Sequence, residues 1–542
     1  MKNKDSATHV NRRQFLKDGT LLIGAAAVGS LSTTQLGLAA GRVAGAAVEG
    51  RSAAETGEVL YNGISLPKEW PPKTMLPNTT MPVPYLQSPP EVIPVDVGRQ
   101  LFVDNFLIEE TTMTRIFHQP EKHPGNPLLS PQQSWEMNKG YCPMAAPFSD
   151  GIFFDAKDQL FKMWYMAGWY DNKTALATSP DGINWTRPKL DVVEGTNIVL
   201  KTPGLCRDGV SVWLDHDTLN AQERFKLYMY VREGEVGGRL HGDGQAGGYL
   251  YTSPDGIHWT LRGKVGPTGD NSTFFYNPFR KQWVFTIRPF FEANTVKFEN
   301  DKRFRGEFAP KGRTRAYWEH ADFLAALGKW RGKDPVFWLG TDKLDARRSG
   351  YEIGDDAQLY KIDAVGYESL MIGFLQIHHG PPNNVCAEGG FPKLTELQLA
   401  FSRDGFHWDR THRETFIGAT LEKDSWERAY IHSIGGVCNI VGDKLYFYYT
   451  AFKGDESKKK TAIDAPDYFS GMYANASTGL AVLRRDGFAS MDSSDRECTL
   501  LTRKLVFRGQ YLFVNLDAPE GELRVEICDE KGTPIAGFKQ AN

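Results

Sequence analysis

Five runs of alternating or continuous apolar residues, rich in aromatic side chains, recur along the chain. They lie at 161–166, 225–230, 282–287, 368–372 and 444–449. Shorter apolar stretches follow, as at 175–178 and 399–401. Runs of this length and composition are typical of β-strands, and no long amphipathic helical pattern competes with them. The pattern predicts a chain built mainly of short strands.

A turn motif follows the strands at regular intervals. The residues SPDGINW at 179–185 recur as SPDGIHW at 253–259 and SRDGFHW at 402–408, with a weaker copy, RDGF, at 485–488. The gap between the second and third copies is about twice the other gaps, so one copy should be hidden there. The stretch 321–323 fits that degenerate copy. The repeat therefore has five units.

The aspartates of these turns, Asp181, Asp255 and Asp404, each precede a glycine. An Asp-Gly pair tolerates the backbone angles of a tight turn, and the Trp that follows can pack the turn against a sheet. We interpret these aspartates as structural and exclude them from the catalytic candidates.

Five strand-rich units favour radial repetition into an all-β fold, a five-bladed β-propeller over residues 96–492 with a central funnel lined by the innermost strands. A solenoid is the alternative, but its repeats are usually shorter. A Pro-rich leader is expected at 46–95. The region 493–542 alternates like half-buried strands and predicts a small C-terminal β-sandwich-like tail packed against the propeller.

The N-terminus reads NRRQFLK at 11–17 and is followed by an uncharged stretch at 19–40 that ends in small residues. This resembles a twin-arginine signal peptide, which we assign to residues 1–45. It implies a periplasmic or secreted protein without a membrane span in its mature form. A chance Arg-Arg pair before a membrane anchor is the alternative, but the stretch is weakly apolar for a permanent span.

Composition narrows the class of partner. The net charge of −3 gives no reason to expect nucleic acid. Aromatic residues make up 12% of the chain, and their flat faces suit sugar rings as well as strand cores. The six cysteines are scattered without metal-ligand spacing and are interpreted as small buried residues. No cofactor or metal is predicted.

The five units with their Asp-Gly turns resemble the five-bladed glycoside hydrolases, the superfamily of families 32, 43, 62 and 68. Arg207-Asp208 is similar to the Arg-Asp pair of family 32, in which the aspartate holds a sugar hydroxyl and stabilises the transition state. Residues 98–104, GRQLFVD, resemble the opening of bacterial proteins loosely grouped with that family. The resemblance covers most of the mature chain.

Two departures limit what the resemblance implies. The family 32 nucleophile motif, Trp-Met-Asn-Asp-Pro-Asn-Gly, is absent, the nearest stretch being 135–141, WEMNKGY. The third unit also lacks a Glu-Cys acid motif. The resemblance thus supports the propeller fold better than it supports fructan hydrolysis.

Glycosidic cleavage usually needs two carboxyl groups on opposite sides of the bond. Aligning the units on their aromatic strands gives four candidate catalytic residues: Asp208, Asp270, Glu136 and Glu368. Asp208 is favoured as the transition-state stabiliser. Each has a structural alternative: an ion pair with Arg207 for Asp208, a turn cap for Asp270, and surface or packing roles for the glutamates. Other carboxylates considered are Glu319, Asp363 and Glu427.

Side chains of other kinds are candidates for substrate binding: Arg207, Tyr141, Arg288, Arg315 and His432. Arg288, Arg313 and Arg315 form a cluster in sequence that would suit a carboxylated or sulfated sugar, unless it is solvated or ion-paired. His378, His379 and His432 could be hydrogen-bond donors, but no spacing supports a metal.

The sequence therefore predicts an exported glycoside hydrolase acting on polysaccharide-derived oligosaccharides. A non-catalytic glycan-binding propeller is the alternative, favoured by the missing nucleophile motif. A third possibility is a lyase, for which a Tyr or His base beside an Arg would be the mark.

Overall fold

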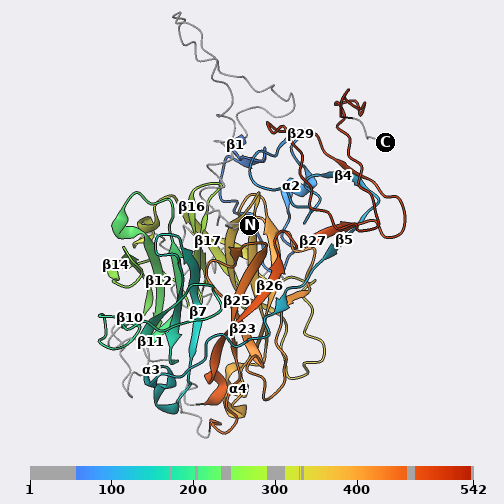
Figure 1. The fold of residues 1–542 in the computed structure, drawn as a ribbon. Helices are drawn as coiled ribbons and strands as arrows, with labels where there is room; N and C mark the ends of the chain where they lie inside the picture. Colours follow the sequence, from blue (N-terminus) through green and yellow to red (C-terminus); the bar gives the residue numbers. More distant parts are fainter. Residues whose placement is uncertain are drawn as a thin grey trace, which may run out of the picture.

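The computed structural model describes residues 56–169, 173–201, 206–232, 246–289, 312–328, 330, 335–460 and 470–538. The predicted signal peptide lies outside these residues, as does the first part of the leader. In the described chain no helix is both long and apolar enough to cross a membrane. The α-helices are single short segments, α2 (Pro84–Gln87), α3 (Ser134–Met137) and α4 (Asn383–Gly389), and strands dominate the ribbon (Figure 1).

Four of the blades are antiparallel sheets of four consecutive strands, numbered here from the funnel outward. Blade 1 contains β7 (Ala145–Asp155), β8 (Leu160–Ala167), β9 (Lys173–Ser179) and β10 (Ile198–Lys201). Blade 2 contains β11 (Cys206–Leu214), β12 (Phe225–Arg232), β13 (Gly247–Ser253) and β14 (Thr260–Lys264). Blade 3 contains β15 (Thr273–Asn277), β16 (Gln282–Ile287), β17 (Arg315–His320) and β18 (Val336–Leu339). Blade 4 contains β19 (Gln358–Tyr367), β20 (Leu370–Gly380), β21 (Leu394–Ser402) and β22 (Thr415–Ile417).

Blade 5 joins the two ends of the propeller. Its strands are β23 (Ala429–Ser433), β25 (Lys444–Phe452), β26 (Ala476–Arg484) and β6 (Glu121–Lys122), and β24 (Asn439–Val441) adds to β25. β6 precedes blade 1 in sequence and pairs with β26 through Val482 and Glu121. The ring is thereby closed by hydrogen bonds between distant parts of the chain. The predicted five-bladed all-β propeller is confirmed.

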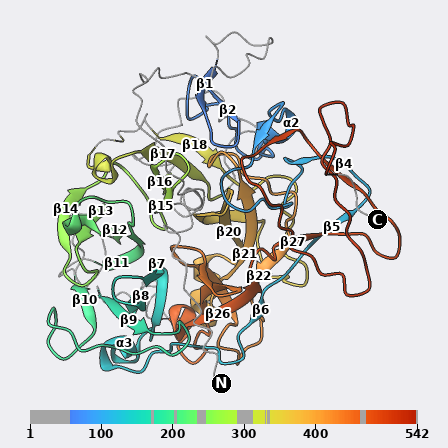
Figure 2. The ribbon, with the colours of Figure 1, turned by 45° about the horizontal axis from the view of Figure 1, so that its top comes forward.

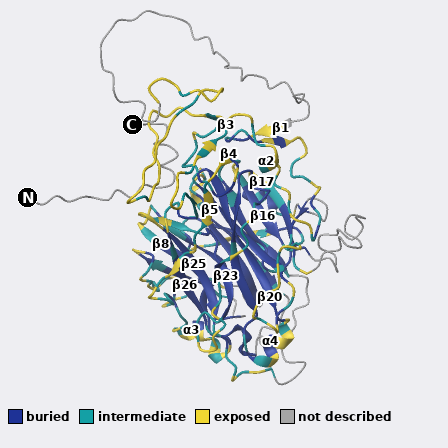
Figure 3. Cartoon of the chain, turned by 90° about the vertical axis from the view of Figure 1, so that its right-hand side faces the viewer, coloured by how far each residue is buried: buried dark blue, intermediate teal, exposed yellow. Residues whose placement is uncertain are grey.

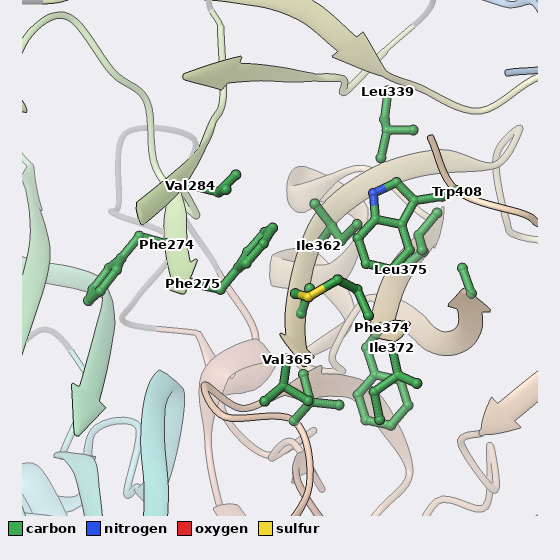
Figure 4. Close-up of a cluster of buried hydrophobic side chains, with 14 of the residues drawn as sticks. Phe274, Phe275, Val284, Leu339, Ile362, Val365, Ile372, Phe374, Leu375 and Trp408 are labelled. Atoms are coloured by element: carbon green, nitrogen blue, oxygen red, sulfur yellow. The ribbon is translucent and has the colours of Figure 1, made fainter. Parts of the chain in front are cut away.

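The inner strands β7, β11, β15, β19 and β23 meet around a common axis (Figure 2). β11 and β20 are buried along their whole length, so the polar side chains that they carry, such as Asp208 and His378, are buried as well. Figure 4 shows how Phe275 of blade 3 and Ile362 of blade 4 fill the space between neighbouring blades. The core therefore runs between the sheets around the ring, as blade-on-blade packing requires.

The repeated turns follow the third strand of each blade. In blade 2, Asp255 Oδ1 accepts the backbone N–H groups of Ile257 and His258 at 2.8 and 2.9 Å. Asp181 and Asp404 make the same pair of contacts in blades 1 and 4. In blade 3 the degenerate copy holds: Asp322 follows β17 and accepts from Leu324 N at 3.0 Å. The five-unit repeat and the structural role of its aspartates are confirmed.

Three of the turns, those of blades 1, 2 and 4, accept a hydrogen bond from the blade that precedes them. Trp164 of blade 1 donates from Nε1 to the carbonyl oxygen of Gly256 in the blade 2 turn at 2.7 Å. Tyr448 of blade 5 donates to Gly182 O at 2.7 Å, and Trp338 of blade 3 donates to Phe406 O at 2.8 Å. The repeated motif is thus a contact between blades as well as a turn within one.

Leader and tail pair with each other at the end of the propeller that holds these turns. β3 (Ile93–Pro94), β4 (Ile108–Thr111) and β5 (Thr114–Phe117) pair with β29 (Leu505–Val506), β28 (Leu500–Thr502) and β27 (Ala489–Asp492) respectively. A hairpin of β1 (Thr56–Val59) and β2 (Ser65–Pro67) precedes them.

The tail departs from its prediction. In place of a small sandwich, the described residues 507–538 contain no extended strand, although alternation predicted strands at 511–515 and 523–527. Tyr511 and Phe513 are 81% and 87% exposed, and Figure 3 shows the tail largely as exposed chain. Alternation alone does not form a sheet, because each strand needs a partner of matching register.

Candidate functional site

The funnel opens at one end into a cavity of about 470 Å³, which we call the funnel mouth. It lies where the inner strands begin, at Phe148 of β7 and Tyr360 of β19, and Asn383 of α4 borders it. The strand register puts this end opposite the Asp-Gly turns, the leader and the tail. The lining side chains are Phe148, Trp169, Tyr230, Arg232, Ala246, Asp270, Arg288, Arg313, Tyr360, Asn383, Lys393, Tyr430 and Tyr473.

Two of the predicted carboxylates come together here. Asp208, in β11, is 2% exposed, and Asp270 precedes β15 in the next blade. Arg232 bridges them, since its Nε donates to Asp208 and its Nη2 donates to Asp270 at 2.7 Å. Arg288 forms an ion pair with Asp270 from the other side. The two carboxylates are thus joined by one guanidinium, and each has at least one oxygen in a charge-assisted contact.

The two arginines occupy matching positions in their blades. Arg232 is the last residue of β12, and Arg288 directly follows β16, the second strand of blade 3. Burial, followed by the charges of Arg313 and Arg232, lowers the pKa of Arg288 to about 10. A guanidinium with this pKa stays charged at neutral pH, but it lies in a strongly positive environment.

A pair of tyrosines faces the carboxylates from blades 4 and 5. The hydroxyl oxygens of Tyr360 and Tyr430 are 2.8 Å apart. Burial raises the pKa of Tyr360, but the charges of Lys393 and Arg313 and the hydrogen bond with Tyr430 outweigh it and bring the pKa to about 8. Burial and the neighbouring Tyr360 hold the pKa of Tyr430 well above its usual value. Tyr360 is therefore the member of the pair that can exchange a proton near neutral pH.

The cations that act on Tyr360 have neutral hydrogen-bond partners. Lys393 is 2% exposed, and its Nζ donates to Asn383 Oδ1 at 2.7 Å. Arg313 donates from Nη1 to Gln358 Oε1 at 2.8 Å. Their charged groups lie over the Tyr360 ring, 5.3 Å from its centroid for Arg313 and 5.6 Å for Lys393. Such contacts stabilise a cation modestly and do not neutralise it.

Two buried histidines support the tyrosine pair. His378 stacks on Tyr360 with ring centroids 5.6 Å apart, and His432 packs between Phe148 and Tyr430. Burial, followed by nearby cations, holds the pKa of both imidazoles well below the usual value. His378 Nε2 and both ring nitrogens of His432 find no hydrogen-bond partner among the described residues. Both rings are neutral, and they pack behind the tyrosines without lining the cavity.

Deeper in the funnel lie charged residues that do not reach the cavity. Arg207, a predicted substrate-binding residue, donates to both carboxylate oxygens of Asp150 at 2.6 Å. Its guanidinium is therefore engaged in a buried ion pair with blade 1. Asp363 accepts from Ser433 Oγ at 2.6 Å and pairs with Lys361 at 2.8 Å.

Arg315, another predicted binding residue, is fully buried. The only hydrogen bond that its guanidinium makes to a described residue is from Nη1 to Thr314 O at 2.8 Å. Burial and the charges of Arg288 and Arg313 hold its pKa well below the usual value. His432 and Arg315 thus lie behind the mouth wall and do not line it.

The predicted glutamates occupy structural positions. Glu136 is fully buried, and its carboxylate accepts bonds from Tyr165 Oη at 2.6 Å and from Arg187 Nε at 2.7 Å. Glu368 lies in the β19–β20 hairpin with φ of +49°, paired with Arg99 at 2.7 Å. That hairpin is about 25 Å along the strand from Tyr360, at the opposite end of the blade. Neither glutamate lines the funnel mouth.

The remaining candidates also lie elsewhere. Tyr141 is 47% exposed on the segment before β7 and does not line the mouth. Glu319 pairs with Arg280 at 2.6 Å, and Glu427 pairs with Lys122 at 2.9 Å. His379 lies 3.8 Å from Glu396. These residues have the predicted chemistry, but none of them lines the funnel mouth.

Sequence reasoning missed the tyrosine pair, Lys393 and Arg232. The sequence did contain a signal for Arg232. Arg232 ends the aromatic run of the second unit, and Arg288 stands at the equivalent position after the aromatic run of the third unit. Tyr360 and Tyr430 lie near the start of the inner strands in consecutive units, and aligning the inner strands would have placed both at the mouth. Lys393 lies in the β20–β21 connection, outside the aromatic runs and turn motifs by which the repeat was recognised.

No protein-family model matches this chain, and no curated protein matches its sequence. Solved structures with a similar fold include an N-acetylgalactosamine deacetylase from F. plautii in complex with blood group B trisaccharide, at 14% identity over 69% of this chain and 95% of that chain, with a TM-score of 0.38. A thermostable family-43 glycoside hydrolase matches at 12% identity over 67% and 97%, with a TM-score of 0.38. An exo-β-1,3-galactanase from Phanerochaete chrysosporium with galactose matches at 10% identity over 67% and 70%, with a TM-score of 0.35. At these identities the similarity concerns the fold alone.

Proposed function

We propose that this protein is an exported enzyme that cleaves glycosidic bonds at the funnel mouth, and that hydrolysis is its reaction. The observation that carries the proposal is the meeting of Asp208 and Asp270, from neighbouring blades, at one cavity. The cavity volume of about 470 Å³ falls in the range of small-molecule sites.

Aromatic side chains on the cavity wall support a sugar as ligand. Phe148, Trp169, Tyr230 and Tyr473 all line the mouth. Trp169 and Tyr473 stack with ring centroids 4.4 Å apart and an interplanar angle of 13°, which gives the wall a rigid flat element. The C–H faces of pyranose rings pack well on such surfaces, because aromatic rings bury a large apolar area in a fixed geometry.

We assign different roles to the acids at the mouth from their contacts. Arg232 pairs with both Asp208 and Asp270, and Arg288 pairs with Asp270, so we assign neither carboxylate as the proton donor. We assign Asp208 to stabilise the positive charge that develops on the sugar ring, and Asp270 to take a proton from water. The proton donor is then Tyr360, whose pKa of about 8 leaves it mostly protonated at neutral pH.

In this reaction the Tyr360 hydroxyl gives its proton to the glycosidic oxygen as the bond from that oxygen to the anomeric carbon breaks. The water oxygen bonds to the anomeric carbon, and its proton passes to Asp270. The negative charge left on the Tyr360 phenolate is stabilised by Lys393 and Arg313 over its ring and by the hydroxyl of Tyr430. One water is consumed for each bond cleaved.

A β-eliminating lyase is the second candidate, and the Tyr360 environment is the observation that favours it. In elimination from a uronic acid, the Tyr360 phenolate removes the proton at C5, the electron pair forms a C4–C5 double bond, and the bond from C4 to the leaving oxygen breaks. That oxygen takes a proton from Tyr430. A cation beside the sugar carboxylate would acidify the C5 proton, and Arg313 or Lys393 meets that need.

The experiment is to incubate the folded protein with neutral and acidic oligosaccharides and weigh the products by mass spectrometry. Hydrolysis adds one water across each cleaved bond, whereas elimination leaves an unsaturated product that absorbs ultraviolet light. The Asp208→Asn variant should lose cleavage, and Asp255→Asn, in a turn at the other end of the propeller, should keep it. Binding without cleavage of any glycan would favour the non-catalytic glycan-binding alternative.

The proposal of export rests on the residues NRRQFLK at 11–17, which precede the weakly apolar stretch at 19–40. We propose the twin-arginine route to the periplasm or the medium. Replacing Arg12 and Arg13 together by Lys should leave the protein in the cytoplasm of an expressing bacterium, as measured by cell fractionation. Unchanged export of that double variant would contradict the route without touching the assignment of the site.

A further inference from the structure

The funnel mouth holds more positive than negative charge. Four cationic side chains line it, whereas Asp270 is the single lining carboxylate among the described residues. Asp208 adds a second negative charge just beneath the wall. An excess of cations in a concave, partly dry site favours an anionic ligand.

The excess is located on one side of the cavity. Arg232 and Arg288 are engaged by Asp208 and Asp270 in blades 2 and 3. Arg313 and Lys393, by contrast, form no ion pair with any described residue, and their hydrogen bonds go to the neutral amides of Gln358 and Asn383. Arg313 Nε has no hydrogen-bond partner in the described part of the chain.

Holding these two charges together costs free energy in the unliganded protein. Lys393 is nearly fully buried, and burial lowers its pKa. The lowered pKa reflects the cost of removing the charged ammonium from water. Both charged groups lie over one ring, that of Tyr360, so they also act on each other. The Tyr360 hydroxyl does not cancel them at neutral pH because it is mostly protonated there. Surplus buried charge of this kind is typical of a site whose counter-charge arrives with the ligand.

We propose that Arg313 and Lys393 form a seat for an anionic group, so that the substrate is an acidic glycan carrying a carboxylate or a sulfate ester. This inference rests on the proposed function and names the substrate class of the same site. The planar Arg313 fork suits two oxygens of one anionic group, while the Lys393 ammonium acts as a point charge on a third oxygen or on the same pair.

The test compares trisaccharides of one sugar series: galactose, galacturonic acid, and galactose carrying a sulfate ester. Their affinities for the wild-type protein are measured by calorimetry in the same buffer, with mass spectrometry to verify that the ligand is intact. If it is cleaved, the titrations are repeated on Asp208→Asn. We expect at least one acidic ligand to bind about tenfold or more tightly than the neutral one, with a preference that falls as salt rises. Which acidic ligand binds identifies carboxylate or sulfate.

Variants locate the preference. Arg313→Gln and Lys393→Gln should each reduce the ratio of acidic to neutral affinity about tenfold. The matched control is Lys444→Gln, an exposed lysine at the start of β25, about 26 Å along the strand from Phe452 at the mouth end. Thermal unfolding checks that each variant is folded. If Lys393→Gln does not fold, the ratio of acidic to neutral affinity of the wild-type protein still tests the proposal.

The outcomes separate this inference from the proposed function. Equal affinity for the acidic and neutral ligands, or a preference that survives both variants, would overturn the seat, even if neutral glycans are cleaved. Selective binding of acidic ligands without cleavage of any glycan would support the anion seat and contradict the proposed enzymatic activity. Selective binding with cleavage supports both.

Discussion

The Asp-Gly turns and the funnel mouth lie at opposite ends of the same blades, and both are organised by aspartates. At the turn end, Asp255 has its acceptor oxygens filled by Ile257 N, His258 N, Ser253 Oγ and the His258 ring. At the mouth, Asp208 and Asp270 are both in direct contact with Arg232, and Asp270 also pairs with Arg288. The turn aspartate is satisfied by its own segment, whereas the mouth aspartates are held by charges from different strands.

The two kinds of aspartate differ in how far they are open to chemistry. A carboxylate whose lone pairs are occupied by adjacent backbone N–H groups fixes a turn and has little left to offer a ligand. A carboxylate held by mobile side-chain cations at a cavity can exchange those partners for a substrate. Repetition marks the first kind, because every blade needs its turn, and isolation marks the second.

The largest expected effect is on catalysis at the mouth. Asp208→Asn removes the negative charge that Arg232 holds beside the cavity, so kcat/KM for the best oligosaccharide should fall by about 10³-fold or more. The measurement is the initial rate of product release, with folding checked by circular dichroism. A rate within about tenfold of wild type would place the chemistry elsewhere.

Next in size is a loss of stability at the turn end. Gly256 has φ of +81°, and an added methyl group would stand 2.5 Å from the Trp164 ring. Gly256→Ala therefore combines backbone strain with overpacking and should lower the free energy of unfolding by about 2–4 kcal/mol. The control is Gly442→Ala, at φ of +61° with nothing within 4 Å, which should cost only about 1–2 kcal/mol. Equal losses in urea unfolding would mean that the contact between blades contributes nothing.

A smaller effect concerns the pH dependence of the mouth. One tyrosine should ionise with a midpoint near pH 8 in an ultraviolet titration, and Tyr360→Phe should remove that step. A hydrolase that uses Tyr360 as proton donor loses activity as pH rises through about 8, whereas a lyase that uses its phenolate gains activity over the same range. Tyr511→Phe, in the exposed tail, is the control. A tyrosine step that persists in Tyr360→Phe would contradict the assignment.

The smallest effect is acid sensitivity at a turn. Burial opposes ionisation of Asp255, but hydrogen bonds from His258 and the turn backbone prevail and lower its pKa to about 2. Because this pKa is depressed in the folded state, the contribution to stability is present above about pH 4 and is lost as pH falls toward 2. Asp255→Asn should cost about 1 kcal/mol at neutral pH, and the difference from wild type should narrow in acid. The measurement is chemical unfolding of both proteins at each pH. A difference in the free energy of unfolding that stays constant from about pH 6 to 2 would contradict this prediction.

Much of the turn end could be predicted from sequence, since its residues repeat with one spacing and one chemistry. The degenerate copy at Asp322 was found from the spacing alone. The closing strand β6 was not predicted, because two residues, Glu121 and Lys122, carry no periodic signal and pair with β26 only once the ring exists. Residues 507–538 misled the prediction for the opposite reason, because they alternate but form no strand with a described partner.

The mouth was predicted only in part. Aligning the units placed Asp208 and Asp270 at the right end of their blades, but the same reasoning also selected Glu368, which lies in a hairpin at the wrong end. Lys393 comes from a connection outside the repeat, and its importance depends on the burial that brings it over Tyr360. Charge balance in a cavity is a property of several distant segments and has no local signature.

The most direct test of the central claim is a crystal structure of the Asp208→Asn protein soaked with an acidic oligosaccharide. We expect the sugar in the funnel mouth, with its scissile bond facing Asp270 and Tyr360 and its anionic group against Arg313 and Lys393. A sugar bound at the turn end or on the outer face of the blades, with the mouth left open, would contradict it.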